Sequence, residues 1–129
     1  MRLLLDTHAV IWALRSPERL SPAAFASISD RGNKLFVSAA SALEIATKTR
    51  IGKLREGEVI LQDYSSRLSR LGAESLPITD PDAILAGSMN WVHRDPFDRI
   101  LAAQALRDEA HLVTADTAFD GFPSLRVLW

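Results

Sequence analysis

The chain contains no cysteine, and this absence excludes several kinds of chemistry at once. Disulfide bonds, thiolate catalysis and cysteine-ligated zinc sites all need a residue that is missing. Proteins without disulfides are typical of reducing compartments. We therefore expect a cytoplasmic protein.

Long hydrophobic runs are missing as well. No apolar segment approaches the roughly 18 residues that a membrane-spanning helix needs. The apolar stretch near the N-terminus is interrupted at Asp6, which is unlike a secretory signal. We expect a soluble protein that does not enter a membrane.

The chain also lacks an excess of charge and a series of aromatic residues. Its 15 lysines and arginines balance 16 aspartates and glutamates, for a formal net charge of −1. Bulk charge therefore does not indicate a nucleic-acid-binding protein, and any such contact would have to be local. We interpret the three tryptophans, Trp12, Trp91 and Trp129, as packing residues rather than platforms for base stacking.

Apolar residues make up 47% of the 129 residues, enough for one packed core. Repeats, low-complexity tracts and long linkers are not apparent. We therefore expect residues 1–129 to form a single domain.

Short apolar segments alternate with helical patterns along the chain. Strands are predicted at 2–5, 34–38, 73–78, 111–115 and 124–129. Helices are predicted at 7–14, 21–32, 41–52, 57–72, 80–90 and 95–109. Wholly apolar strands are typical of a sheet covered by helices on both faces. The pattern predicts a three-layer α/β/α sandwich whose mostly parallel sheet has about five strands.

Four acidic residues fall just after predicted strands or in the first turns of predicted helices. Asp6 follows the first strand and Asp116 follows the strand at 111–115, while Glu44 and Asp98 are expected in the first turns of two helices. In a parallel α/β sheet, ligands bind beyond the carboxyl ends of the strands. We therefore expect these four side chains to lie near one another.

Each acid also has an ordinary explanation as part of a helix start. Asp6 and Asp116 fit N-caps, and the segment from Ser41 to Glu44 fits a capping box. Asp98 would be favoured by the helix dipole in the turn that follows Asp95. Capping does not require the acids to converge, however, and crowded carboxylates repel each other. A divalent cation with oxygen ligands, such as Mg²⁺, would relieve that repulsion.

Four blocks of sequence resemble one known family: LLLDTHAVIWAL, VSAASALEIATKTRIGKL, HRDPFDRILAAQAL, and LVTADTAF with LRVLW. They resemble the PIN-domain ribonucleases and, among these, the VapC toxins of bacterial toxin–antitoxin pairs. The resemblance runs almost end to end and keeps the order of the blocks. It implies a PIN-like fold and a metal-dependent endoribonuclease that hydrolyses RNA phosphodiester bonds with metal-activated water.

The resemblance also implies roles for individual residues. Asp6, Glu44, Asp98 and Asp116 match the acidic quartet of the family, and Thr114 matches a Thr or Ser near the metal. We expect Asp6 and Asp98 to bind the metal directly. Glu44 and Asp116 would orient waters, complete a second site or act as general base.

Asp98, rather than Asp95, matches the family position because it directly precedes RILAAQA. This leaves Asp95 as a helix cap or an outer group of the site. The resemblance further implies Mg²⁺ as cofactor with Mn²⁺ as substitute, a VapB-like antitoxin with an arginine-bearing tail, and a homodimer. We expect the association surface near Trp12, Ile28 and Leu61.

Basic residues follow Glu44 in the segment KTRIGKLR, which includes Lys48, Arg50 and Lys53. They are either a solvated helix end or contacts for RNA phosphates. Arg99, next to Asp98, is expected to touch RNA or a carboxylate.

His8 and His93 lie near these acids, but a zinc site would lack a third nitrogen or sulfur ligand, so we expect structural or solvent roles. Two other functions stay open: another aspartate-based phosphohydrolase, and a catalytically inactive PIN-fold binding module. A haloacid-dehalogenase-like phosphatase would need Asp-x-Asp after the first strand, where this chain has His8. The presence of all four acids argues against an inactive module.

Overall fold

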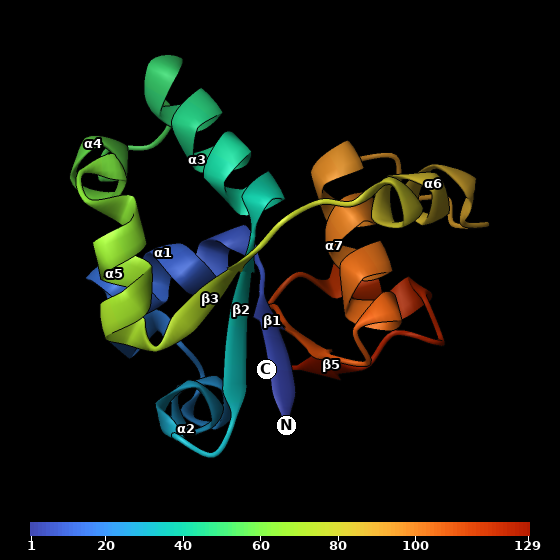
Figure 1. The fold of residues 1–129 in the computed structure, drawn as a ribbon, viewed down its shortest axis with the longest axis horizontal. Helices are drawn as coiled ribbons and strands as arrows, with labels where there is room; N and C mark the ends of the chain where they lie inside the picture. Colours follow the sequence, from blue (N-terminus) through green and yellow to red (C-terminus); the bar gives the residue numbers. More distant parts are fainter.

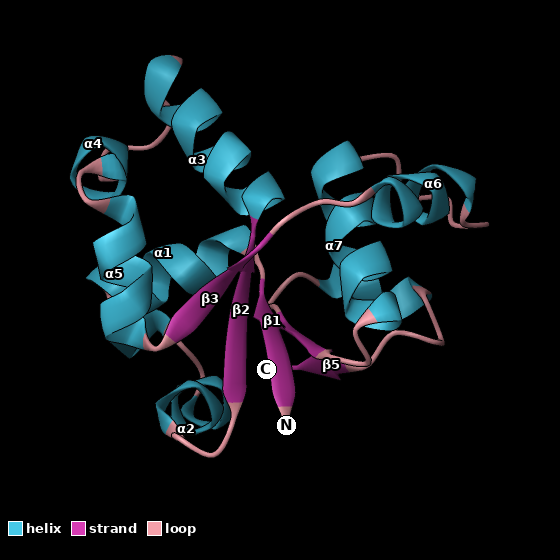
Figure 2. Cartoon of the chain, in the orientation of Figure 1, coloured by secondary structure: helices cyan, strands magenta, loops and turns pink.

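The structure is a computed structural model that describes residues 1–129. One sheet of five strands, in the order β3-β2-β1-β4-β5, runs through its centre. The strands are β1 (Arg2–Leu5), β2 (Lys34–Ser38), β3 (Ala73–Leu76), β4 (His111–Val113) and β5 (Val127–Leu128). Every neighbouring pair is parallel, and Figure 2 shows the strands in magenta between the helices. The predicted α/β architecture is confirmed.

Helices cover both faces of this sheet. They are α1 (Thr7–Arg15), α2 (Pro22–Ser29), α3 (Ala39–Arg50), α4 (Gly57–Leu61), α5 (Tyr64–Leu71), α6 (Asp80–Ser88) and α7 (Pro96–Arg107). Two short 3-10 helices are η1 (Pro17–Arg19) and η2 (Thr117–Gly121). Figure 1 shows α1, α2 and α5 on one side of the sheet and α6 and α7 on the other. None of the helices has the length and apolar character needed to cross a membrane.

Successive side chains of β1 point to opposite faces, which explains why the strand is apolar throughout. Leu3 and Leu5 enter a cluster with residues of α1, α2 and α5. Leu4 enters a second cluster with residues of α7 and with Phe119 of η2. β1 is therefore central to both halves of the core.

The order of the strands places a switch point between β1 and β4. From β1 the chain moves outward through β2 to β3, and it then crosses over to β4 and β5 on the other side. Crossovers on opposite sides leave a crevice at the carboxyl ends of the two central strands. Asp6 and Thr114 are the residues that directly follow those strands.

Several predicted element bounds are wrong in detail. The helix expected over 57–72 is two helices, because Asp63 adopts a left-handed conformation with φ of 53° between α4 and α5. The helix predicted over 80–90 ends at Ser88, and Thr79 caps its start by forming a capping box with Asp82. β3, β4 and β5 are each shorter than predicted, because the residues at their predicted ends lie in turns and loops.

The expected association surface is largely used inside the protein. Ile28 is only 8% exposed and belongs to the core under α2. Trp12 and Leu61 pack against a third cluster, formed by Ile11 of α1, Ile45 of α3 and Ile60 of α4. Ile28 is therefore not part of a free apolar patch, whereas Trp12 and Leu61 are partly exposed.

Candidate functional site

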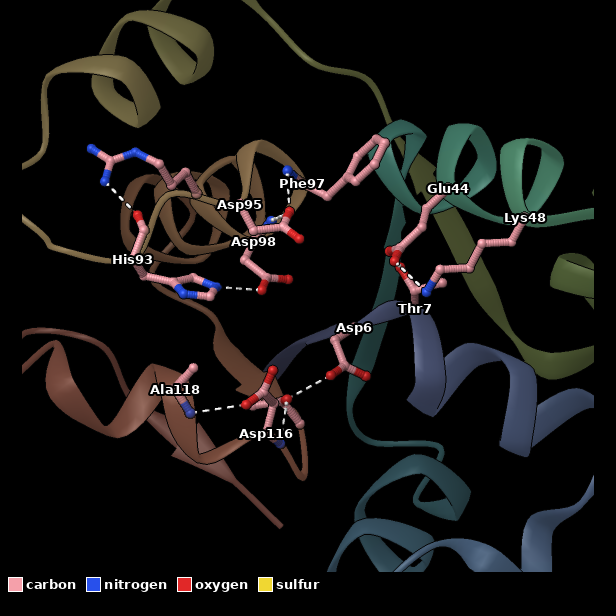
Figure 3. Close-up of polar contacts among 12 residues, drawn as sticks. Asp6, Thr7, Glu44, Lys48, His93, Asp95, Phe97, Asp98, Asp116 and Ala118 are labelled. Atoms are coloured by element: carbon pink, nitrogen blue, oxygen red, sulfur yellow. Dashed lines mark hydrogen bonds and ion pairs between the residues drawn. The ribbon is translucent and has the colours of Figure 1, made fainter. Parts of the chain in front are cut away.

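A polar pocket of ≈ 180 Å³ lies at the carboxyl ends of β1 and β4, and no hydrophobic residue lines it. Its lining consists of Asp6, Thr7, His8, Glu44, Lys48, Asp95, Asp98 and Asp116. Figure 3 labels all of these residues except His8, and shows their side chains arriving from the starts of α1 and α7, from α3, and from the turn after β4. The structure thus brings the four expected acids and Asp95 together in one pocket.

Asp6 is both a helix cap and a wall of the pocket. Its Oδ1 accepts a hydrogen bond from the backbone N–H of Ala9 at 2.8 Å, which caps α1 as predicted. Its Oδ2 accepts a hydrogen bond from the hydroxyl of Thr114. The residue is only 7% exposed, and burial raises the pKa of its carboxyl above the ordinary value.

Thr114 connects the two central strands through its hydroxyl. The side chain is buried, donates to Asp6 and accepts from the backbone N–H of Asp116 at 3.0 Å. Asp116 in turn accepts from the N–H of Ala118 at 2.9 Å and caps η2. Its position near Asp6 is therefore set by a short chain of hydrogen bonds.

Glu44 reaches the pocket from the second turn of α3, not from the first turn as predicted. The helix starts earlier than expected, because the hydroxyl of Ser38 accepts from the N–H of Ala40 and caps it. Ser41 is therefore not a cap, and its hydroxyl instead contacts that of Thr7 at 3.1 Å. The predicted capping box from Ser41 to Glu44 is wrong.

Two neighbours hold the Glu44 carboxylate in the pocket. The hydroxyl of Thr7 donates to its Oε1 at 2.6 Å, and the Nζ of Lys48 lies 2.8 Å from its Oε2. Thr7 is a site residue that sequence reasoning missed. Its only local signal is its place beside Asp6 at the end of β1, where its side chain points toward α3 (Figure 3).

Asp98 and Asp95 share the start of α7 but differ in their surroundings. Asp95 accepts from the N–H groups of Phe97 and Asp98 at 2.9 and 3.2 Å, so it is the cap that the sequence predicted. The Oδ2 of Asp98 lies 2.6 Å from the Nε2 of His93. Burial raises the pKa of the Asp98 carboxyl, and the nearby charges of Asp95 and Asp116 raise it further.

Arg99 takes a different role from the one expected. Its guanidinium donates to the backbone carbonyls of Ala86, Met89, Trp91 and His93 at 2.6 to 2.9 Å. It forms no ion pair with a carboxylate. These bonds engage its donors in holding the loop between α6 and α7, so neither the predicted carboxylate contact nor the predicted RNA contact fits its position.

The remaining basic residues separate into two groups. Lys48 and Lys53 line a second hollow of ≈ 430 Å³, together with His8, Trp12 and Arg19. This hollow shares His8 and Lys48 with the acidic pocket, so the two adjoin. Arg50 is exposed near the end of α3 and lines neither hollow.

The donors of the acidic pocket fit a hard divalent cation. In the present side-chain positions no three acidic or histidine residues are arranged to hold one ion directly. Mg²⁺ usually takes only one or two carboxylates and keeps several waters, so a set of three is not required. Asp6 and Asp98 fit best, because burial disfavours the charge on both and a cation would offset that cost. His93 already contacts Asp98, which leaves no nitrogen or sulfur set for zinc.

Comparisons with known proteins concern the family and the fold of the chain. The profile of the PIN domain family matches residues 3–124. No relative among curated proteins matches the chain.

Solved structures with a similar fold come from bacterial protein complexes. VapBC2 from Rickettsia felis, bound to a DNA fragment from its promoter, has a TM-score of 0.72 at 18% identity and covers 98% of this chain and 97% of its own. VapBC-1 from nontypeable Haemophilus influenzae has a TM-score of 0.66 at 18% identity, with 98% and 96% covered. FitAcB from Neisseria gonorrhoeae has a TM-score of 0.64 at 21% identity, with 97% and 95% covered. At these identities the likeness concerns the fold.

Proposed function

Because the chain belongs to the PIN domain family, we propose that it is a metal-dependent endoribonuclease and the toxin of a VapBC-type toxin–antitoxin pair. One observation carries this proposal: five carboxylates from four separate parts of the chain, two of them at the start of α7, line a pocket with no hydrophobic residue at the switch point of the sheet. Helix caps alone would not require Asp6, Glu44, Asp98 and Asp116 to share a pocket. A nuclease that works through a cation does require it.

Asp6 and Asp98 are the proposed ligands of Mg²⁺, for which Mn²⁺ would substitute. The chemistry that such a cation supplies is activation of water and neutralisation of charge on the phosphate. Glu44 is held by Thr7 and Lys48, so it adds negative charge in a fixed place. Asp116 is exposed, and its Oδ2 accepts no hydrogen bond within the protein. It is therefore the carboxylate that we propose accepts the proton of the attacking water.

RNA is the proposed substrate because the acidic pocket adjoins a hollow with basic and aromatic side chains. Lys48, Lys53 and Arg19 can neutralise phosphates on either side of the cleaved bond. His8 and Trp12 also line this hollow, but Trp12 packs against His8 and lies under the Arg19 guanidinium, so it shapes the hollow and is not a free platform for bases. A positively charged groove that follows the phosphate backbone is a usual means of binding single-stranded nucleic acid.

A VapB-like antitoxin is the proposed partner. The similar structures named for toxin–antitoxin pairs support this proposal through their shared fold. An arginine in the antitoxin tail would meet complementary charge in the acidic pocket and could occupy the place of the cation. We also propose a homodimer.

The deciding experiment is a cleavage assay with the purified chain. Labelled RNA and DNA of the same sequence are incubated with Mg²⁺, with Mn²⁺, or with EDTA. The proposal expects RNA cleavage that needs a divalent cation and is lost in Asp6→Asn and Glu44→Gln, both of which should still fold. RNA binding without cleavage would indicate an inactive binding module. Release of phosphate from small monoesters, with RNA left intact, would indicate another phosphohydrolase.

A further inference from the structure

The loop between α6 and α7, residues 89–95, is held by hydrogen bonds from one arginine side chain. The Arg99 guanidinium donates to the carbonyls of Met89, Trp91 and His93 within this loop, and to Ala86 at the end of α6. A planar guanidinium has its donors in a fixed fork, so it imposes one arrangement on the carbonyls it binds. The backbone of His93 is thus held by a residue adjacent to Asp98.

The His93 ring packs against two aromatic rings. Its centroid lies 4.9 Å from that of Trp91 and 6.4 Å from that of Phe119. Trp91 itself packs against Phe119 and Phe122. Val92, between the two inward rings, is 95% exposed, so alternate side chains of the loop face the protein and the solvent.

This packing places the ring edge against one oxygen of a proposed ligand. The Nε2 of His93 lies 2.6 Å from the Oδ2 of Asp98, while the Oδ1 of Asp98 has no hydrogen-bond partner in the protein. Figure 3 shows the imidazole meeting Asp98 from the side of the loop while Asp98 lines the pocket. A hydrogen on Nε2 would fix the carboxylate plane and leave Oδ1 available to a cation.

We propose that His93 is a positioning residue, which holds Asp98 through an Nε2–H donor so that Oδ1 is presented to a divalent cation in the pocket. The inference rests on the proposed function, because it assumes that the pocket binds such a cation. Partners that orient a metal ligand typically contribute 10- to 100-fold (order of magnitude) to metal affinity. His93 is then not a metal ligand, as the sequence already suggested, but the partner of one.

Mn²⁺ affinity, measured by titration calorimetry on the full chain, separates this role from simple packing. His93→Leu keeps an apolar side chain against Trp91 but removes the donor, and we expect Mn²⁺ to bind about 10- to 100-fold more weakly. His93→Gln keeps an amide donor and should retain most of the affinity. His111→Leu removes a histidine on β4, outside the pocket, and serves as the matched control.

Each outcome bears on the inference. Wild-type affinity in His93→Leu would overturn it and leave the proposed function standing. An equal loss in His93→Gln and His93→Leu would overturn the role of the donor. A wild type that binds no Mn²⁺ would overturn both the inference and the proposed metal dependence.

A second measurement needs no variant and therefore does not depend on folding of His93→Leu. Long-range ¹H–¹⁵N correlation spectra of the metal-free wild type report which ring nitrogen carries the hydrogen. We expect the neutral His93 ring to carry it on Nε2. A neutral ring with its hydrogen on Nδ1 would overturn the inference, because Asp98 would then face a nitrogen that cannot donate.

Discussion

Asp6 meets two demands with its two carboxylate oxygens. Oδ1 caps α1, and Oδ2 accepts from Thr114 across the boundary between β1 and β4. Capping and metal binding are therefore not alternatives for this acid at a helix start. Here the cap fixes the side chain in the pocket, and each oxygen retains a lone pair for a further contact.

The raised pKa of Asp6 predicts how the metal-free protein responds to pH. Because the folded chain binds this proton more tightly than the unfolded chain, the ionised carboxyl costs stability at neutral pH. The stabilisation that comes from protonated Asp6 is fully present below the ordinary carboxyl pKa of about 4. It is lost as pH rises through the raised pKa of Asp6 in the folded protein. Asp6→Asn, which still caps α1, should therefore increase the free energy of unfolding near neutral pH.

Urea denaturation of both proteins in EDTA, from about pH 4 to pH 7, tests this prediction. The difference between mutant and wild type should shrink as pH falls, since the wild-type carboxyl then becomes neutral. A mutant that is less stable than wild type at neutral pH would mean that the cap and Thr114 stabilise the charge fully.

Asp95 and Asp98 should respond differently to the same substitution. Asn caps a helix about as well as Asp, so Asp95→Asn should keep both the fold and most of the RNA cleavage. Asp98→Asn removes a proposed ligand and should reduce cleavage by about 100-fold or more. The rates of RNA cleavage by the two purified variants show which of the two acids is the metal ligand. Loss in Asp95→Asn with retention in Asp98→Asn would reverse the assignment within DPFD.

At the scale of elements, the α6–α7 loop depends on a single side chain. Arg99→Met would keep the apolar stem but leave four carbonyls without their donor. Unsatisfied buried acceptors cost about 1–3 kcal/mol each, reduced where water enters. We predict a loss of about 2–4 kcal/mol in the free energy of unfolding.

Hydrogen exchange shows whether the loss is local. Amides of residues 89–95 should exchange faster in Arg99→Met, since the loop would open without global unfolding. Arg94→Met, at an exposed position of the same loop, is the matched control and should behave as wild type. Unchanged exchange in Arg99→Met would show that the aromatic contacts of Trp91 alone hold the loop.

For the whole molecule, metal binding should appear as thermal stabilisation. Mn²⁺ that binds only the folded state stabilises it by about 2.7 kcal/mol at 100 times its Kd. We predict a clear rise of the wild-type Tm in millimolar Mn²⁺ and little change for Asp6→Asn. Thermal melts of both proteins, with and without Mn²⁺, measure this. Equal shifts in the two proteins would leave Asp6 as an ordinary helix cap.

The proposed homodimer is also tested on the intact chain. Large apolar side chains remain exposed on α3 and α6, where Leu43 is 58% and Ile84 is 69% exposed. Covering such surface is a common reason for association. We predict the mass of a dimer by light scattering at tens of micromolar, reduced toward a monomer in Leu43→Glu or Ile84→Glu. A wild-type monomer would contradict the prediction.

Local patterns in the sequence were sufficient for the architecture. Apolar strands without alternation predicted a sheet covered on both faces, and Leu3, Leu4 and Leu5 are indeed buried against opposite layers. Asp6, Asp95 and Asp116 were correctly predicted as caps, since capping depends on residues within one turn. The edge shared by Asp6, Glu44 and Asp116 also followed from strand direction, because parallel strands end on the same side. Asp98 begins a helix that follows α6 and not a strand, so its place at this edge depends on the tertiary structure.

Tertiary structure decided the contacts between residues far apart in the chain. Ser38 and Ser41 are both plausible caps, and only the packing of α3 shows that Ser38 is the cap and that Thr7 reaches Glu44. Arg99 stands beside an acid in sequence, yet it binds carbonyls because the loop folds over it. Local signals specify periodicity and helix ends, whereas the partner of a polar side chain depends on which elements the whole core brings together.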